Sequence, residues 1–115
     1  LCRHIVKNEK CNLIIIDKLT YASNLKSLED VIKKENVFFY EESIGNIKFM
    51  NSILFKYAPK FIFNLAAETH VDNSILNPSV FIETNILDTF NFSNKPISEN
   101  FITRIIWVYS IWYKA

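Results

Sequence analysis

The sequence predicts an α/β fold in which helices cover both faces of a parallel sheet. Short apolar runs end in polar residues, and the segments between them repeat apolar residues at helical spacing. Strands joined by helix-sized connections form βαβ units, which build a doubly wound parallel sheet. The 115 residues are 50% hydrophobic, which suits one globular domain.

The expected strands are rich in β-branched and aromatic residues. Residues 13–16 form a continuous apolar run that ends in Asp17, which is typical of a strand buried on both faces. Residues 37–40 and 61–63 predict the second and third strands, and residues 102–109 predict a fourth.

The expected helices lie between these strands. Residues 25–32 repeat leucine, valine and isoleucine at helical spacing, with Ser23 or Asn24 as the N-cap. Residues 47–57 form a second apolar helical face. Residues 78–90 open on a proline, which the first turn of a helix tolerates, and predict a third helix.

The composition argues against several classes of partner. The chain has 13 basic and 12 acidic residues, so it has no general electrostatic attraction to nucleic acid or membrane surfaces. Cys2 and Cys11 do not form a disulfide framework of the secreted type, and no signal peptide is recognisable, so we expect a cytoplasmic protein. The apolar stretch over residues 105–113 is far shorter than the ~20 residues that a membrane span needs.

The segment after the third expected strand is the most informative part of the chain. Ligands of open α/β sheets bind beyond the carboxyl ends of the strands, where residues 65–74 begin. Small residues at Ala66 and Ala67 allow a ligand to approach the backbone, and Glu68 and Thr69 offer polar contacts. The alternative is an ordinary strand-to-loop junction.

A metal site is a second alternative for this segment. Glu68, His70 and Asp72 alternate, so an extended backbone places them on one side. Metal sites usually draw ligands from several elements, so we expect no metal here.

The glycine-rich turn of a dinucleotide-binding fold is absent. Such a fold has that turn after its first strand and an acidic residue about 20 positions later, at the end of its second strand. Asp17 fits the acidic position, but the only glycine is Gly45. We therefore expect a fragment that lacks the first strand, with residues 1–9 as the tail of the first helix.

The missing strand would lie at the centre of the sheet, between the strands at residues 13–17 and 61–63. Either those two strands pair directly, or two half-sheets expose their edges.

Three segments together resemble the dTDP-glucose 4,6-dehydratases, a family of extended short-chain dehydrogenases/reductases. They are residues 17–25, 65–75 and 81–85, and the resemblance runs from Leu13 to about Phe90. It implies a partial Rossmann-like, NAD-binding domain over residues 1–115. It also implies a lyase in which NAD takes hydride from C4 of the sugar, water is eliminated across C5 and C6, and the hydride returns to C6.

The resemblance also assigns cofactor contacts. Asp17 would accept hydrogen bonds from the adenosine ribose and repel the extra phosphate of NADP; the alternative is an acid at a strand end that serves as a helix N-cap. Thr69 would face both cofactor and sugar, and Thr84 alone is an ordinary helical threonine. The full set of implied cofactor contacts is Asp17, Lys18, Leu19, Thr20, Ser43, Ile44, Leu65, Ala66, Ala67, Glu68, Thr69 and Thr84.

Position 43 departs from the family pattern. Ser43 stands where the family usually has an aspartate near the adenine, followed by Ile44. A neutral hydroxyl is a weaker acceptor than a carboxylate, which puts adenine recognition in doubt.

No catalytic residue of the family is present. None of the five tyrosines has a lysine four positions later, and the chain ends before the family's Asp-Glu pair. Residues 91–115 also depart from the family pattern. The chain alone is therefore expected to be inactive, and two alternatives remain: a non-enzymatic remnant or interaction module, or a fragment of a related nucleotide-sugar epimerase. The resemblance implies dTDP-glucose as substrate, rhamnose synthesis as the pathway and a homodimer for the full-length enzyme.

Overall fold

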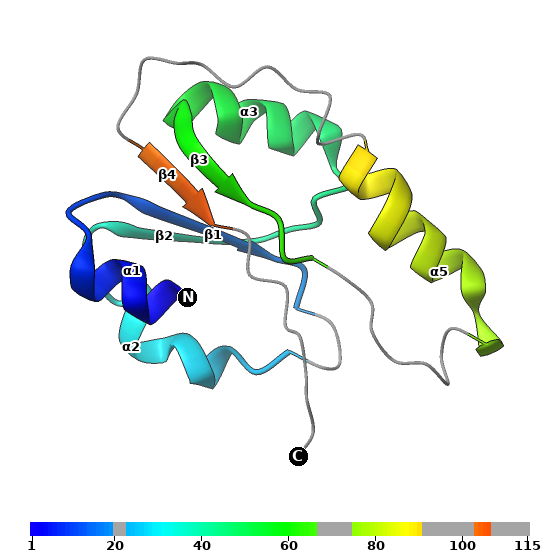
Figure 1. Ribbon diagram of the computed structural model, residues 1–115, viewed down its shortest axis with the longest axis horizontal. Coiled ribbons are helices and arrows are strands. Elements are labelled where there is room, and N and C mark those ends of the chain that lie inside the picture. The colour runs from blue at the N-terminus through cyan, green and yellow to red at the C-terminus, as the bar shows by residue number, and fades with distance from the viewer. Residues whose placement is uncertain (20–22, 67–74, 91–102, 107–115) are drawn as a thin grey trace.

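The computed structural model describes residues 1–19, 23–66, 75–90 and 103–106 (Figure 1). Its strands form one parallel sheet in the order β2-β1-β4-β3. The strands are β1 (Leu13–Asp17), β2 (Val37–Glu41), β3 (Pro59–Phe63) and β4 (Thr103–Ile106). Helices pack on both faces of this sheet, so the predicted α/β class is confirmed.

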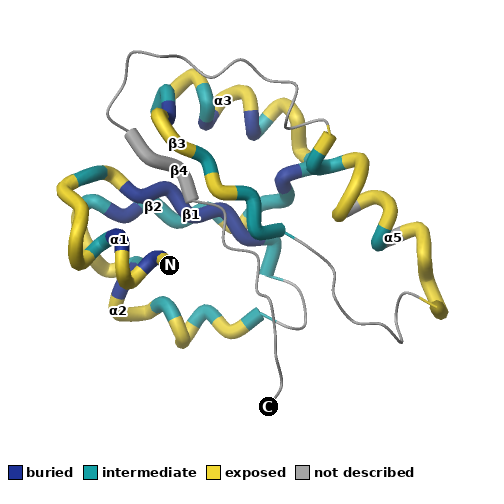
Figure 2. Tube along the Cα trace, in the orientation of Figure 1, coloured by how far each residue is buried: buried dark blue, intermediate teal, exposed yellow. Residues whose placement is uncertain are grey.

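Strand β1 forms the core of the molecule. All five of its residues are buried, and Figure 2 shows this strand as the main buried segment. Leu13 and Ile15 pack on one face of the sheet, while Ile14 and Ile16 pack on the other. The continuous apolar run therefore reflects burial on both faces, as the sequence predicted.

Two short helices cover the first face. Helix α1 (Cys2–Asn8) confirms the expected helical tail, and a 3₁₀ turn η1 (Leu25–Leu28) leads into α2 (Glu29–Ile32). Arg3 and Asp30 join α1 to α2 through an exposed ion pair of 2.9 Å.

The predicted N-cap of the helix over residues 25–32 is confirmed in position but not in its bond. Asn24, one of the two predicted candidates, occupies the N-cap position of η1 without a side-chain capping bond. The hydroxyl of Ser23, the other candidate, donates to Oδ1 of Asp17, at 3.4 Å.

Helix α3 (Ile47–Tyr57) covers the other face. Its N-terminus is capped by Asn46, whose Oδ1 accepts a hydrogen bond from the Phe49 amide at 3.1 Å. Met50 and Ile53 of this helix are buried against the sheet. The helix ends at Ala58, in the left-handed conformation with φ of 40°.

The last helical segment begins where the sequence predicted. Helix α5 (Pro78–Ile82) passes into a π-helical stretch η2 (Glu83–Asp88). Several large apolar residues of this segment are exposed: Ile82, Ile86, Leu87 and Phe90.

Strand β4 confirms the predicted fourth strand over residues 103–106; residues 102 and 107–109 lie outside the described part of the chain. It pairs in parallel with both β1 and β3. Both expected arrangements, direct pairing of β1 with β3 and separate half-sheets, are therefore wrong. A late segment of high β-propensity fills the central place and pairs two inner edges that would otherwise be unpaired.

Cys2 is a buried free thiol and Cys11 is a half-buried one. Within the described residues, no helix has the length and apolar character required to cross a bilayer.

Candidate functional site

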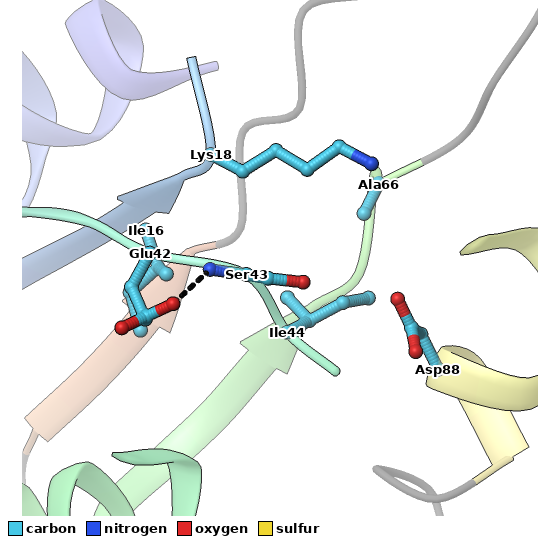
Figure 3. A pocket seen from close by; sticks show the side chains of 7 residues that line it. All are labelled: Ile16, Lys18, Glu42, Ser43, Ile44, Ala66 and Asp88. Carbon is cyan, nitrogen blue, oxygen red and sulfur yellow. Dashed lines mark hydrogen bonds between the residues drawn. The ribbon is translucent and has the colours of Figure 1, made fainter. Parts of the chain in front are cut away.

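The carboxyl ends of the parallel strands meet at one edge of the sheet, where ligands of this fold class bind. Asp17 ends β1, Ser43 follows β2, and Ala66 follows β3. Residues far apart in the sequence therefore converge at this edge (Figure 3).

The Asp17 carboxylate is largely shielded from solvent. The residue is only 5% exposed, and its Oδ1 accepts hydrogen bonds from the Leu19 amide at 2.8 Å and from Ser23. Burial raises the pKa of the Asp17 carboxyl, and these two hydrogen bonds oppose the increase. Leu19, whose amide donates to this acid, has a left-handed backbone conformation with a φ of 48°.

The alternative role of Asp17 as a helix cap is not what the structure shows. Its carboxylate bonds to the loop that follows β1, whereas η1 begins at Leu25 with Asn24 as its N-cap. The acid is therefore positioned by a turn at the sheet edge.

A hollow lies at the ends of β1, β2 and β3 (Figure 3), and Asp17 is not among the residues that line it. Its open space is about 230 Å³ including the mouth, and its enclosed part is about the size of one water molecule. The lining residues are Ile16, Lys18, Glu42, Ser43, Ile44, Ala66 and Asp88.

The loop after β2 is ordered by its own side chains. The Glu42 carboxylate accepts a hydrogen bond from the Ser43 amide at 2.9 Å, and Ser43 Oγ accepts one from the Gly45 amide at 3.1 Å. Ile44 is buried, at the edge of the cluster beneath α3. The hydroxyl oxygen of Ser43 thus already accepts a hydrogen bond from a backbone amide.

Asp88 is a site residue that the sequence reasoning missed. It lies at the end of η2, yet its side chain reaches the hollow beside Ile44 (Figure 3). Burial raises the pKa of the Asp88 carboxyl, and Glu83 raises it further, while Lys18 opposes the increase. A Cβ added at Gly45 would collide with the Asp88 carboxylate, so the absence of a side chain at Gly45 makes room for it. The sequence has a single glycine, Gly45, which could have indicated a close contact at this position. The sequence does not show which residue makes that contact.

Among the described residues after β3, Ala66 lines the hollow. The Ala66 amide donates a hydrogen bond to Asn64 Oδ1 at 3.1 Å, and Asn64 Nδ2 donates to Thr89 Oγ1 at 3.2 Å. Leu65 is half-buried beside Ala66, and neither Leu65 nor Leu19 lines the hollow. These bonds tie the end of β3 to the helical segment that carries Asp88.

Several predicted contacts cannot be compared with the structure. Thr20, Ala67, Glu68 and Thr69 lie outside the described residues, as do His70 and Asp72. Thr84 lies in η2, but its side chain is outside the description. Among the described residues, no group of acids, histidines and cysteines could hold a metal ion.

Sequence comparison finds two kinds of match. A family model described as GDP-mannose 4,6 dehydratase matches residues 1–95. The dTDP-glucose 4,6-dehydratases of Shigella flexneri and Salmonella typhimurium are each 44% identical to this chain over 88 residues, or 76% of its length. The chain spans about a quarter of the length of these curated relatives, since the match covers 24% of each.

Comparison with solved structures finds an epimerase and a dehydratase. UDP-glucose 4-epimerase from Thermotoga maritima, solved with UDP-glucose, superposes with a TM-score of 0.71 at 26% identity, over 91% of this chain and 31% of that one. A dTDP-glucose 4,6-dehydratase from Streptomyces venezuelae, solved with NAD bound, superposes with a TM-score of 0.69 at 31% identity, over 77% of this chain and 27% of that one. The family match includes every residue that lines the hollow.

Proposed function

Because this chain belongs to the GDP-mannose 4,6 dehydratase family, we propose that it forms the adenosine-binding part of the NAD site of a dTDP-glucose 4,6-dehydratase. The resemblance stated from the motifs agrees with this family assignment. The 44% identity to dTDP-glucose 4,6-dehydratases supports the choice of activity within the family.

The observation that carries the proposal is the buried acid at the same sheet edge as the hollow. Asp17 ends β1, and Ile16 and Lys18, its neighbours in sequence, line the hollow, which has apolar walls from Ile16 and Ile44. A carboxylate here can accept hydrogen bonds from the two ribose hydroxyls, while apolar walls suit the faces of a base. The same charge would repel the 2′-phosphate of NADP, so NAD is the proposed cofactor.

The residues present fit only one half of that cofactor. The sequence lacks the glycine-rich turn whose amides would bind the pyrophosphate. NAD would supply the hydride acceptor for oxidation of the sugar at C4, while this chain would bind and orient the adenosine through Asp17, Lys18 and Ser43. None of the five tyrosines has a lysine four positions later, so the proposed role of this chain is to bind the cofactor and not to supply the catalytic acid and base.

The remaining assignments follow from the family. We propose dTDP-glucose as the substrate, with Thr69 at its boundary with the cofactor, and rhamnose synthesis as the pathway. A cytoplasmic location and a homodimer of the full-length enzyme complete the proposal, with no nucleic-acid or membrane partner.

A nucleotide-sugar epimerase is the second candidate. It is favoured by the superposition on UDP-glucose 4-epimerase, which covers 91% of this chain. The adenosine site proposed here would serve both enzymes, whereas the stronger sequence match is to the dehydratases.

The test is a titration of the full chain with two ligands, in which amide NMR spectra are recorded at each ligand concentration. The ligands are 5′-AMP and adenosine 2′,5′-bisphosphate, which differ by the 2′-phosphate that Asp17 would repel. We expect weak binding of 5′-AMP, with shifts at Lys18, Ser43 and Ala66, and roughly tenfold weaker binding of the bisphosphate. In Asp17→Asn this preference should largely disappear. Equal binding of both ligands by the wild-type chain, or no shifts at these residues, would contradict the proposal.

A further inference from the structure

The polar groups of the hollow decide which base it accepts. Its walls are apolar at Ile16, Ile44 and Ala66, and they discriminate poorly among flat aromatic rings. Buried hydrogen-bonding groups discriminate much more strongly, because a mismatched ligand leaves them unpaired. The acceptors at the rim therefore determine specificity.

Ser43 is a weak candidate for the specifying acceptor. Its Oγ already accepts the Gly45 amide, and a neutral hydroxyl forms weaker hydrogen bonds than a carboxylate. The amino group of adenine therefore needs another acceptor within reach of this loop.

Asp88 offers that acceptor. It lines the same hollow as Ser43, and its carboxylate lies across the loop that contains Gly45 (Figure 3). Within the part of the chain that the structure describes, this carboxylate has no hydrogen-bond donor. It is also held there by tertiary structure, since η2 and the end of β3 are joined through Asn64 and Thr89.

We infer that the Asp88 carboxylate accepts the hydrogen bond from the amino group of adenine and thereby selects adenine over an oxo-purine. The inference rests on the proposed adenosine site and adds the residue that specifies the base. Adenine carries an amino donor at C6, whereas hypoxanthine carries an oxygen acceptor there. A carboxylate accepts the first and repels the second.

The same geometry has an alternative interpretation, in which Asp88 obstructs the hollow. The two interpretations predict opposite effects of removing Asp88 on ligand binding. The enclosed part of the hollow holds only about one water molecule, so a base must lie at the open mouth. If Asp88 merely obstructed the hollow, its removal would strengthen binding. If Asp88 accepts the amino group, its removal weakens binding.

The experiment compares 5′-AMP with 5′-IMP on the 115-residue chain. These probes share the ribose and phosphate and differ only in the base. For the wild-type chain we expect AMP to bind roughly tenfold more tightly than IMP, the scale of one hydrogen bond to a charged group. This comparison requires no variant, so it does not depend on how a substitution affects folding.

Two variants then assign the effect to the residue. Asp88→Asn should bind AMP roughly tenfold more weakly and IMP somewhat more tightly, because an amide can donate to the C6 oxygen. Asp88→Ala should also bind AMP more weakly. The matched control is Glu83→Gln, which removes an exposed acid from the same segment outside the lining and should keep the AMP preference.

The outcomes separate this inference from the proposed function. Binding of AMP with Asp17-dependent rejection of the 2′-phosphate but equal affinity for IMP would overturn the role of Asp88 and leave the adenosine site standing. Stronger AMP binding by Asp88→Ala would overturn it in favour of obstruction. No binding of AMP at all would overturn both.

Discussion

At the scale of single residues, the site depends on two carboxylates in environments that disfavour their charge. Asp17 and Asp88 both have raised pKa values, and burial is the largest cause for each. A fold that only maximised stability would place neutral groups at these positions. Carboxylates at these positions are consistent with ligand binding, which uses the charge that folding disfavours.

Substitution of Asp17 should reveal this cost. A raised folded-state pKa means that the folded chain binds the proton more tightly than the unfolded chain, so the ionised acid lowers stability above the folded pKa. Asp17→Asn keeps an acceptor for Leu19 and should be more stable than wild type at pH 7. The gain should vanish below the ordinary carboxyl pKa of about 4. Urea unfolding across this pH range measures the effect.

Asp30 provides a control of opposite sign. Its pKa is lowered by the hydrogen bond from Arg3, so Asp30→Asn should slightly lower stability at pH 7 and have no effect once the acid is protonated. If both variants changed stability in the same direction at pH 7, the assigned environment of Asp17 would be wrong.

Gly45 should be required for space. None of the described residues is a glycine with positive φ, so the constraint at Gly45 is the neighbouring carboxylate of Asp88. Gly45→Ala should cost less than about 1 kcal/mol, because the flexible end of Asp88 can move away, but it should weaken AMP binding. In an Asp88→Ala background, Gly45→Ala should have no further effect on either quantity. A double-mutant cycle by urea unfolding and NMR titration tests this coupling.

At the scale of elements, α3 couples the loop of the site to the core. Its N-cap Asn46 follows the Ser43–Gly45 turn directly, and its buried face packs on β1 through Met50 and Ile53. The position of the hollow therefore depends on the packing of this helix.

Two substitutions on α3 should have very different effects. Ile53 is 3% exposed and Phe55 is 91% exposed, although they are two positions apart. Ile53→Ala should lower the unfolding free energy by about 2–5 kcal/mol, whereas Phe55→Ala should change it by less than about 0.5 kcal/mol. Equal losses in urea unfolding would mean that α3 packs through a different face.

The predictable elements were those with strong local patterns. The continuous run from Leu13 to Ile16 identified β1 and its two buried faces, and the spacing of Met50 and Ile53 identified the inner face of α3. Asp88 had no such pattern, because its contact with Gly45 joins two distant segments. The passage of α5 into π-helical geometry was also hidden, since it depends on backbone hydrogen-bond choice.

At the scale of the whole molecule, β4 joins two groups of strands, the β1–β2 pair and β3, into one sheet. It pairs with β1 on one side and β3 on the other. The sequence identified this strand but not its place, because β-propensity does not specify which edge a strand will join.

A proline in β4 should separate these groups. Ile105 lies opposite Ile14 of β1 and Ile62 of β3, so Ile105→Pro removes an amide from the middle of the sheet. We expect a loss of roughly 2–3 kcal/mol in unfolding free energy. The matched control is Lys10→Pro, which follows the extended residue Glu9 just after α1 and should be tolerated. Equal losses for both variants would contradict the central position of β4.

The position of β4 also sets the order in which the chain can fold during its synthesis. The strand that joins β1 to β3 leaves the ribosome after both of them, so the sheet cannot be completed while residues 103–106 are still in the exit tunnel. Until then β1 and β3 each carry an unpaired edge, which neighbouring nascent chains can occupy. The yield of folded protein should therefore depend on how soon β4 is synthesised and leaves the ribosome.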